Sequence, residues 1–317
     1  MNFKTLAPYF TLLFIIIVSY VLFQSLSRLD WKIIVQALEQ VPFHILFPGA
    51  ILSLVNYMIL SHYDYLGVRL FKLPLSYNRT IWSAFFCYVF NLNLGALVGG
   101  MAFRFRVYTG WSLPKDKVPF ILLFSTLTNW TGYLLLLSLL MLLESSAVAK
   151  LLNLPKWSFH LSGFVGLSLV IMYFVSCMIG QEATIKGKKI KFPSWKMSLI
   201  QIFSSCVQWG LMASIVFYFL HYFKVDVTYH DVLFTYLIAS VVGVVAHIPA
   251  GLGVVEAVFL KLQIDANSED LVVALICFRI VYYLVPLLIA LPGYISLEFF
   301  QKRLFRPINA SSPKKKN

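Results

Sequence analysis

The sequence predicts an all-α polytopic membrane protein, with six spans and two re-entrant hairpins arranged as an inverted repeat and both termini in the cytoplasm. Three observations predict this fold. The chain of 317 residues is 60% hydrophobic and 12% charged, which is not the composition of a soluble domain. Long runs without Asp, Glu, Lys or Arg recur along the chain. Two of these apolar stretches also contain helix breakers and polar residues.

The charge-free runs predict the membrane segments in order. Each run exceeds the roughly 20 residues with which an α-helix crosses a ~30 Å hydrocarbon core. The runs are Thr5–Ser27, Gln40–Tyr63, Thr80–Phe103, Val118–Leu143, Trp157–Gln181, Met197–Phe223 and Val232–Val255. A further apolar stretch, Leu271–Leu297, is interrupted only by Arg279. The intervals between the runs are too short for a soluble domain, so we expect one membrane domain over 1–317.

The stretch SVVGVVAHIPAGLGVVEAVFL (Ser240–Leu260) does not fit a simple span, because Pro249 divides it into unequal limbs. The second limb, Val254–Gln263, rises only about 15 Å at 1.5 Å per residue. Proline with Gly251 and Gly253 supplies a turn, and such backbone is tolerated at depth only where protein or a wet cavity covers it. We interpret 232–263 as a re-entrant hairpin rather than two crossings.

A second broken segment, Ile81–Tyr108, contains NLNLGALVGG followed by AFRFRVY. Two asparagines lie two residues apart, so an ideal helix cannot place both on one face. Glycines weaken the helix beyond them, and two arginines follow in a limb too short to cross. These residues are Asn91, Asn93, Gly95, Gly99, Gly100, Arg104 and Arg106. Close helix packing through the GxxxG of Gly95 and Gly99 is the alternative, but the added polar residues favour a hairpin over 81–108.

Lysine and arginine concentrate on one side of this arrangement, which the positive-inside rule assigns to the cytoplasm. That side holds Lys4, the basic residues of 67–80, Lys115 and Lys117, the five lysines of 181–196 and the basic residues of 302–316. The other side holds Arg28, Lys32, Lys150, Lys156, Lys224 and Lys261. The asymmetry predicts an N-in/C-in topology.

Three crossings precede a break near 144–157 and three follow it, so the second half is expected to be inverted relative to the first. The half-repeats are 1–145 and 158–305, and a basic cytoplasmic tail, 306–317, follows them. The hairpins then enter from opposite faces, the first from the cytoplasm and the second from outside. Broken helices that meet at mid-membrane are typical of transporters.

Arg279 lies eight residues into the last span, about 12 Å from its start. An arginine at this depth is a functional hypothesis that requires a partner, and Glu256 in the second hairpin is the predicted one. Two interpretations stay open: an ion pair that braces the hairpin, or a lipid-headgroup site. Tyr282 and Tyr283 follow at i+3 and i+4, on the face of Arg279 in an ideal helix.

Other polar residues and absent motifs limit the functions. His247 is a candidate for titration or substrate contact, although a lone histidine is more often a satisfied core group. His62 and Asp64 are expected at the membrane interface. The sequence has no P-loop, H-E-x-x-H, G-x-S-x-G or Cys–His cluster. We expect no enzyme activity, no cofactor, no metal and, despite the net charge of +13, no nucleic-acid partner.

HIPAGLGVVEAVF (His247–Phe259) resembles the Pro-Gly-Gly-x-Gly-x-x-Glu-Ala signature of the flippase-like family, the transmembrane region of lysylphosphatidylglycerol synthases and their stand-alone relatives. Four further stretches resemble its YbhN-type inner-membrane branch: CYVFNLNLGALVGGMAFRFRVYTGWSLP, TLTNWTGY, IKGKKIKFPSWK and FRIVYYLVPLL. The synthases also carry a soluble aminoacyl-transferase domain, which we do not expect in this chain. Many relatives have a Pro-x-Arg-x-Gly-Glu-like turn where this sequence has Leu97-Val98-Gly99-Gly100.

The resemblance implies a multi-pass protein of the bacterial cytoplasmic membrane that moves a phospholipid or other anionic lipid between leaflets, as a flippase or scramblase. Phospholipids are the expected partners, with a membrane enzyme as a possible further one. The candidate headgroup-binding residues are Arg279, Glu256, Arg104, Arg106, Asn91, Asn93, His247 and Tyr283. The alternatives are a non-transporting scaffold that binds lipid or a partner enzyme, and a proton-coupled solute transporter that uses Glu256 or His247.

Overall fold

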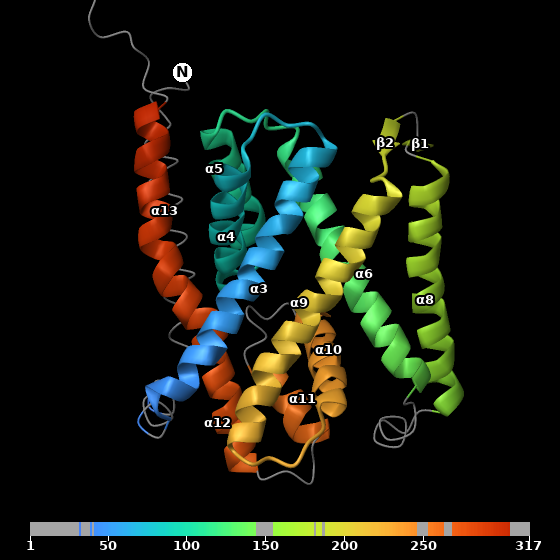
Figure 1. Cartoon of the computed structure of the whole chain (residues 1–317), viewed down its shortest axis with the longest axis vertical. Coiled ribbons are helices and arrows are strands. Elements are labelled where there is room, and N and C mark those ends of the chain that lie inside the picture. The colour runs from blue at the N-terminus through green and yellow to red at the C-terminus, as the bar shows by residue number, and fades with distance from the viewer. Residues whose placement is uncertain are drawn as a thin grey trace, which may run out of the picture.

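The structure is a computed structural model that describes residues 41–143, 155–180, 182–185, 188–245, 253–262 and 268–304, together with Lys32 and Glu39. The described chain is mainly helical, and its helices lie roughly along one common direction (Figure 1). Several predicted features lie outside the described residues. They are the first span Thr5–Ser27, the tail 306–317 and the residues His247, Pro249 and Gly251 of the second hairpin.

Five helices in the described ranges are long and apolar enough to cross a membrane. Four are uninterrupted: α3 (Phe43–Leu70), α6 (Val118–Leu143), α8 (Lys156–Ile179) and α9 (Trp195–Tyr222). The fifth is composite, with α12 (Ser268–Arg279) and α13 (Val285–Leu304) joined by the π-helix η3 (Ile280–Leu284). These helices confirm five of the predicted apolar segments as long helices.

The predicted first hairpin is broken where the sequence suggested. Helix α4 (Tyr77–Leu94) ends at Gly95, whose φ of 83° favours glycine, and the π-helix η1 (Ala96–Ala102) and the short α5 (Phe103–Gly110) follow. The rings of Phe90 and Phe103 stack with centroids 4.2 Å apart, so the second limb packs back against α4.

Two glycines that we expected in this turn have a different role. Gly99 and Gly100 lie inside η1 rather than at the turn. A Cβ on Gly99 would lie 2.5 Å from the backbone nitrogen of Asn91, so the absence of a side chain lets η1 approach the α4 backbone closely. Gly95 alone of the three occupies the turn.

The second broken segment consists of α10 (Tyr229–Val245) and α11 (Val254–Leu262). Gly253, immediately before α11, has φ 77°, so a glycine with positive φ precedes the short limb here as Gly95 does in the first segment. Figure 1 places α4 and α5 at one end of the molecule and α10 and α11 at the other. A short antiparallel β-hairpin that we did not anticipate, β1 (Glu182–Ile185) and β2 (Lys188–Lys191), connects α8 to α9.

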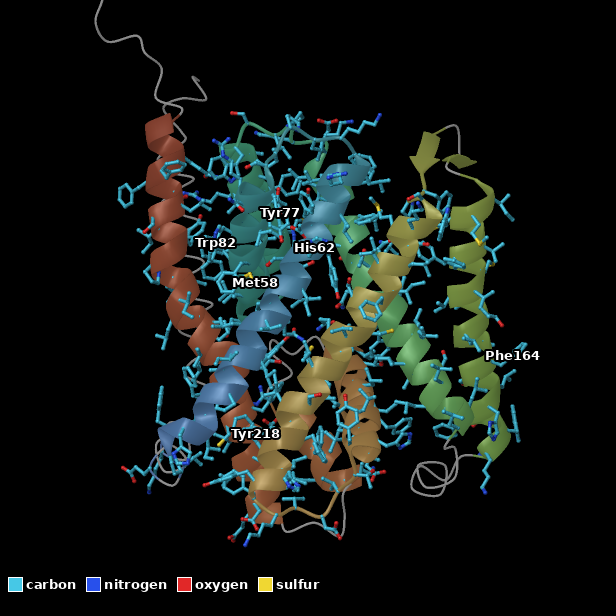
Figure 2. The ribbon with its side chains drawn as sticks, in the orientation of Figure 1. Met58, His62, Tyr77, Trp82, Phe164 and Tyr218 are labelled. Carbon is cyan, nitrogen blue, oxygen red and sulfur yellow. The ribbon has the colours of Figure 1, made fainter. Side chains whose placement is uncertain are left out.

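The outer surface of the helices is apolar, as lipid contact requires. Phe164 on α8 is 64% exposed and points away from the other helices (Figure 2), and Phe203 on α9 is 72% exposed. Polar side chains such as Ser53, Asn56 and Gln201 are buried instead. This distribution is the reverse of a soluble protein, in which polar groups face the solvent.

A hydrogen-bonded cluster at the centre joins helices from both halves of the sequence. Asn56 on α3 donates from Nδ2 to the Gln208 carbonyl on α9 (2.7 Å) and accepts at Oδ1 from the Tyr282 hydroxyl (2.9 Å). The Tyr57 hydroxyl donates to the Tyr282 carbonyl, inside η3, at 3.1 Å. The cluster fixes the π-helical segment of the last span against α3.

Helices α6 and α9 meet at Gly132. The Gly132 N–H donates to Ser205 Oγ at 3.1 Å, and a Cβ on Gly132 would come within 2.5 Å of the Ser205 carbonyl carbon. Small residues allow this backbone approach, which is a common device in membrane helix pairs. The contact joins a span from each half of the sequence.

Candidate functional site

The predicted pair of Arg279 and Glu256 is formed. Arg279 ends α12, and Glu256 lies in the first turn of α11, where the positive end of the helix dipole favours a carboxylate. Arg279 donates from Nε to Glu256 Oε1 and from Nη2 to Oε2, the latter at 2.7 Å. The side chains are 11% and 18% exposed, so the pair is mostly covered by protein but part of its surface is accessible.

The residues after Arg279 do not follow ideal helical periodicity, because η3 begins directly after it. The guanidinium carbon of Arg279 lies 5.8 Å from the centroid of the Tyr283 ring, so this predicted neighbour stays close. Tyr282 instead turns inward, where it is fully buried and hydrogen-bonded to Asn56. The two rings still adjoin, with centroids 5.4 Å apart, but only Tyr283 lies beside the Arg279 guanidinium in a ring contact. Single π-turns are frequent at functional sites.

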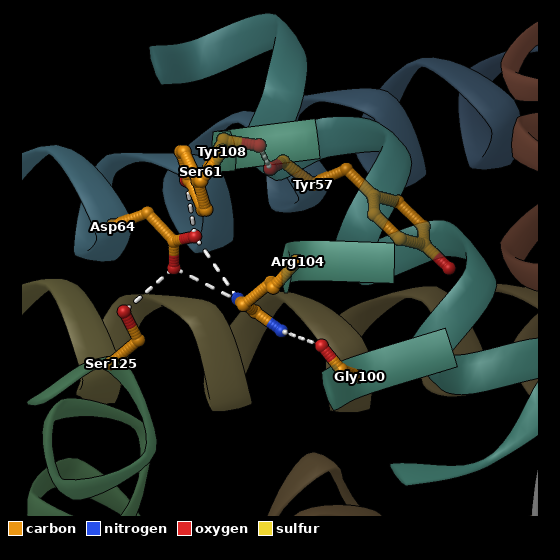
Figure 3. A network of polar contacts seen from close by, with 7 residues as sticks. All are labelled: Tyr57, Ser61, Asp64, Gly100, Arg104, Tyr108 and Ser125. Carbon is orange, nitrogen blue, oxygen red and sulfur yellow. Dashed lines mark hydrogen bonds and ion pairs between the residues drawn. The ribbon is translucent and has the colours of Figure 1, made fainter. Parts of the chain in front are cut away.

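A second charged cluster is centred on Asp64 of α3 (Figure 3). Arg104 of α5 donates from Nε to Asp64 Oδ2 at 3.1 Å and from Nη2 to Oδ1 at 3.2 Å. Tyr108 donates to Oδ2 and Ser125 of α6 to Oδ1, both at 2.6 Å. The cluster thus joins α3, α5 and α6, and the two charged side chains are 0% and 2% exposed.

This burial corrects two expectations. Asp64 does not lie at the interface, because it accepts hydrogen bonds in the interior from three helix-borne side chains. Arg104, expected to contact a headgroup, has its guanidinium held by Asp64 and the Gly100 carbonyl (3.3 Å), 4.5 Å from the Tyr88 ring centroid. Its position identifies it as a residue that fixes α5 rather than one that reaches lipid.

Arg106, two residues further along α5, forms a third pair with Glu298 of α13. The Tyr294 hydroxyl also donates to Glu298 Oε1, at 3.1 Å. Their side chains are 22% and 23% exposed, more than those of the other two pairs. No sequence spacing connects α5 to residue 298, so we did not predict Glu298 as the partner of Arg106.

The asparagines of the first hairpin differ in their surroundings. Asn93 donates from Nδ2 to the Val89 carbonyl at 2.9 Å, within its own helix, and is buried. Asn91 is partly buried, and its side-chain oxygen lies beside Gly100 of η1. Both asparagines lie in the last turn of α4, whereas Arg279 ends α12 and Glu256 lies in the first turn of α11. His247 lies outside the described residues.

The fold and the paired charges in an apolar interior define a multi-pass helical membrane protein. In the described ranges no group of three His, Cys, Asp or Glu side chains is placed to hold a metal ion. Residues 10–290 match the family model described as the lysylphosphatidylglycerol synthase TM region. The chain belongs to this family and is a multi-pass protein of the bacterial cytoplasmic membrane.

Several curated proteins are similar to the chain. It is 33% identical to the inner membrane protein YbhN of Escherichia coli over 298 residues, 93% of each chain. It is 30% identical to an uncharacterized protein of Synechocystis sp. over 263 residues, 80% of this chain and 79% of the relative. A phosphatidylglycerol lysyltransferase of Staphylococcus aureus is 28% identical over 292 residues, 89% of this chain but only 32% of that enzyme.

Proposed function

We propose that this chain is a lipid transporter, a flippase or scramblase that moves a phospholipid or another anionic lipid between leaflets. The main cost of such movement is desolvation of the headgroup, because the acyl chains can stay in lipid. A protein lowers this cost by offering polar partners inside the apolar core. The observation that carries the proposal is the partly exposed Arg279–Glu256 pair, which a broken helix and a π-helix position among long apolar helices.

The chemistry of the pair suits a phospholipid headgroup. A guanidinium binds phosphate with a fork of N–H donors, and a carboxylate accepts from an ammonium group. Arg279 would therefore contact the phosphate and Glu256 a cationic part of the headgroup. Arg106 and Glu298 offer the same two charges near the other end of the last span. When a headgroup that carries both charges binds, its phosphate can replace the carboxylate beside the arginine and its cationic group can replace the arginine beside the carboxylate. No buried charge then loses its partner.

Re-entrant hairpins in an inverted repeat are part of the proposal. Helices α5 and α11 have eight and nine residues, which rise only about 12 and 14 Å. They belong to broken segments at opposite ends of the molecule (Figure 1), which supports half-repeats over 1–145 and 158–305. Alternating access around a site between such repeats is a common transport mechanism.

The family supports a lipid as the substrate class. The matched region occurs in Staphylococcus aureus proteins named phosphatidylglycerol lysyltransferases, and that name specifies a phospholipid. We propose a phospholipid as the substrate of this chain too, but we do not propose lysyl transfer. The proposal gives the chain no catalytic step, and an enzyme that makes or modifies the lipid would be its partner.

Leaflet exchange in liposomes tests the proposal. Purified protein is reconstituted, and labelled phospholipids, aminoacyl-lipids and prenyl phosphates are compared for exchange between leaflets. We expect acceleration of at least one class and a loss of at least tenfold in Arg279→Gln. Lys117→Gln, at a lysine 47% exposed in a loop, is the matched control and should exchange lipid at the wild-type rate. Acceleration of no class by well-folded protein would refute transport.

One observation favours a second candidate, a non-transporting scaffold. The Arg279–Glu256 pair is bidentate, as a brace between α11 and the last span would be. Glu256→Leu with Arg279→Met replaces the pair by apolar side chains, which often leaves stability unchanged. Normal folding with unchanged cellular activity would support the scaffold, and normal folding with lost activity would support transport.

A further inference from the structure

Two buried polar side chains, one on α3 and one on α9, are unusual in their hydrogen bonding. Ser53 of α3 is 0% exposed and Gln208 of α9 is 2% exposed. Within the described part of the chain, the Ser53 hydroxyl and Gln208 Oε1 are buried without a hydrogen-bond partner from the protein. A buried polar atom that forms no hydrogen bond is costly in an apolar interior, and native structures normally supply a partner.

The packing of α3 against α9 places the two groups at one level. Asn56 of α3 donates to the Gln208 carbonyl, and a Cβ on Gly49, seven residues earlier, would lie 2.8 Å from the ring of Phe219, eleven residues later on α9. The two helices therefore run antiparallel along this contact. Ser53 lies four residues after Gly49 and three before Asn56, so it shares their face of α3. It faces the turn of α9 that follows Gln208.

The Gln208 side chain extends along α9 toward this level. Its Nε2 donates to the Sδ of Met212, one turn further along the helix. The amide oxygen on the same carbon therefore lies near the level of Ser53. Asn56 Oδ1 accepts from the Tyr282 hydroxyl at 2.9 Å, and a carboxamide oxygen has a second lone pair. Three side-chain oxygens from two helices thus lie within about one helical turn of one another.

The hydroxyl of Ser53 also differs from those of other serines in the described helices. Ser61, two turns further along α3 and equally buried, donates to the Tyr57 carbonyl at 2.7 Å. Ser214 and Ser240 donate in the same way to carbonyls four residues earlier, at 2.8 and 2.7 Å. A bond of this kind satisfies a hydroxyl within its own helix. Ser53 does not form one, which favours a partner outside its helix.

We propose that a buried water molecule binds between α3 and α9 and bridges Ser53 Oγ, Gln208 Oε1 and Asn56 Oδ1. Water suits these groups because it can accept from the hydroxyl and donate to the two carboxamide oxygens. About three hydrogen bonds are typical of a buried water. The side chains that would surround it are neutral, and a desolvated cation among neutral groups costs far more than a water.

The position of the water gives it a structural role. Asn56 and Gln208 lie at the middle of α3 and of α9, respectively, and these helices come from different halves of the sequence. The water would therefore join the two halves near the centre of the membrane, beside the hydrogen bond from Tyr282 that fixes the last span. This inference is independent of lipid transport and holds equally for a scaffold.

A high-resolution experimental structure of the full chain tests the inference directly. We expect one water peak at about 2.7–3.2 Å from Ser53 Oγ, Gln208 Oε1 and Asn56 Oδ1. A peak closer than about 2.6 Å to several oxygens would indicate a metal cation and would overturn the inference, as would the lack of any peak. The melting temperature should also stay the same when choline replaces Na⁺ in the buffer, and a decrease would likewise favour a cation.

Thermal unfolding in detergent provides a second, independent test. Ser53→Ala should lower the melting temperature by roughly 2–6 °C, because the water and Gln208 lose a hydrogen-bond partner. Gln208→Leu should lower it as well, and S53A/Q208L should cost less than the sum of the single changes, since both remove contacts to one water. Ser61→Ala is the matched control, at an equally buried serine of the same helix, and should stay within about 2 °C of the wild type.

The sign of the Ser53→Ala effect separates the alternatives. A hydroxyl that is truly unpaired costs free energy in the folded protein, so its removal would raise the melting temperature. A hydroxyl that bonds within its own helix would make Ser53→Ala behave like Ser61→Ala. Either result, or additive effects of Ser53→Ala and Gln208→Leu, would overturn the inference.

Discussion

Replacement of Asp64 by Asn tests how strongly the Asp64–Arg104 cluster holds the first broken segment in place. The change keeps the size of the side chain but removes its charge, and it leaves Arg104 at 2% exposure without an anion. Removal of one partner of a buried ion pair costs about 3–5 kcal/mol. Arg104 keeps the Gly100 carbonyl and the Tyr88 ring, and a desolvated cation–π contact offsets up to about 2 kcal/mol. We therefore expect a loss near the lower limit, about 3 kcal/mol.

Thermal unfolding in detergent with a thiol-reactive dye measures this loss, because Cys87, Cys177 and Cys277 are free and buried until the protein unfolds. At about 2–4 °C per kcal/mol, Asp64→Asn should lower the melting temperature by roughly 6–12 °C. Asp116→Asn, in the exposed pair with Lys117, should cost no more than about 1 kcal/mol.

A double-mutant cycle isolates the ion pair. Arg104→Gln leaves a buried carboxylate that Tyr108 and Ser125 still satisfy in part. In the double variant D64N/R104Q both charges are absent, so it should cost at least about 2 kcal/mol less than the sum of the single changes. A melting temperature for Asp64→Asn within 1–2 °C of the wild type, or additive costs, would refute the reasoning.

Two further predictions concern packing and topology. Gly132→Ala should destabilise the protein by about 1–3 kcal/mol, because the new Cβ meets the Ser205 backbone; Gly210→Ala, whose Cβ would lie no closer than 3.5 Å to another group, should be neutral or stabilising by up to about 1 kcal/mol in the same melting assay. In a cysteine-free background, a membrane-impermeant thiol reagent should label cysteines at His230 and Asn267 in intact spheroplasts, but not those at Asn78 and Lys117. Labelling of positions 78 and 117 from opposite faces would contradict the first re-entrant hairpin.

The sequence predicted features that depend on local composition. Charge-free length located five long helices, because hydrophobicity over about 20 residues decides membrane insertion. Helix breaks were predicted near Gly95 and Gly253, because glycine is the residue that adopts positive φ without strain. The Arg279–Glu256 pair was predicted because an arginine within an apolar span requires an acidic partner, and the second hairpin offered one.

Features that depend on contacts between distant segments were not predicted. Asp64 was assigned to the interface because it lies near the end of an apolar run, yet α5 folds back to bring Arg104 to it. Glu298 meets Arg106 across 192 positions of sequence, which no local pattern encodes. The π-helix η3 could not be predicted from its composition, because the residues of Ile280–Leu284 are equally compatible with an ordinary α-helix. A search for every acidic residue near an apolar run would have found Asp64 as a partner for Arg104.

The π-helix at Ile280–Leu284 sets the rotational phase between the two ends of the last span. In a π-turn one more residue is accommodated than in an α-turn, so deletion of a single residue here would restore continuous α-helix. Each residue of an α-helix turns the chain by about 100°, so winding the same five residues as α-helix without that deletion would swing α13 about its axis relative to α12. Arg279 would still face Glu256, while Glu298 would turn away from Arg106. One residue in this segment therefore determines whether the last span can pair with Glu256 and with Arg106 at the same time.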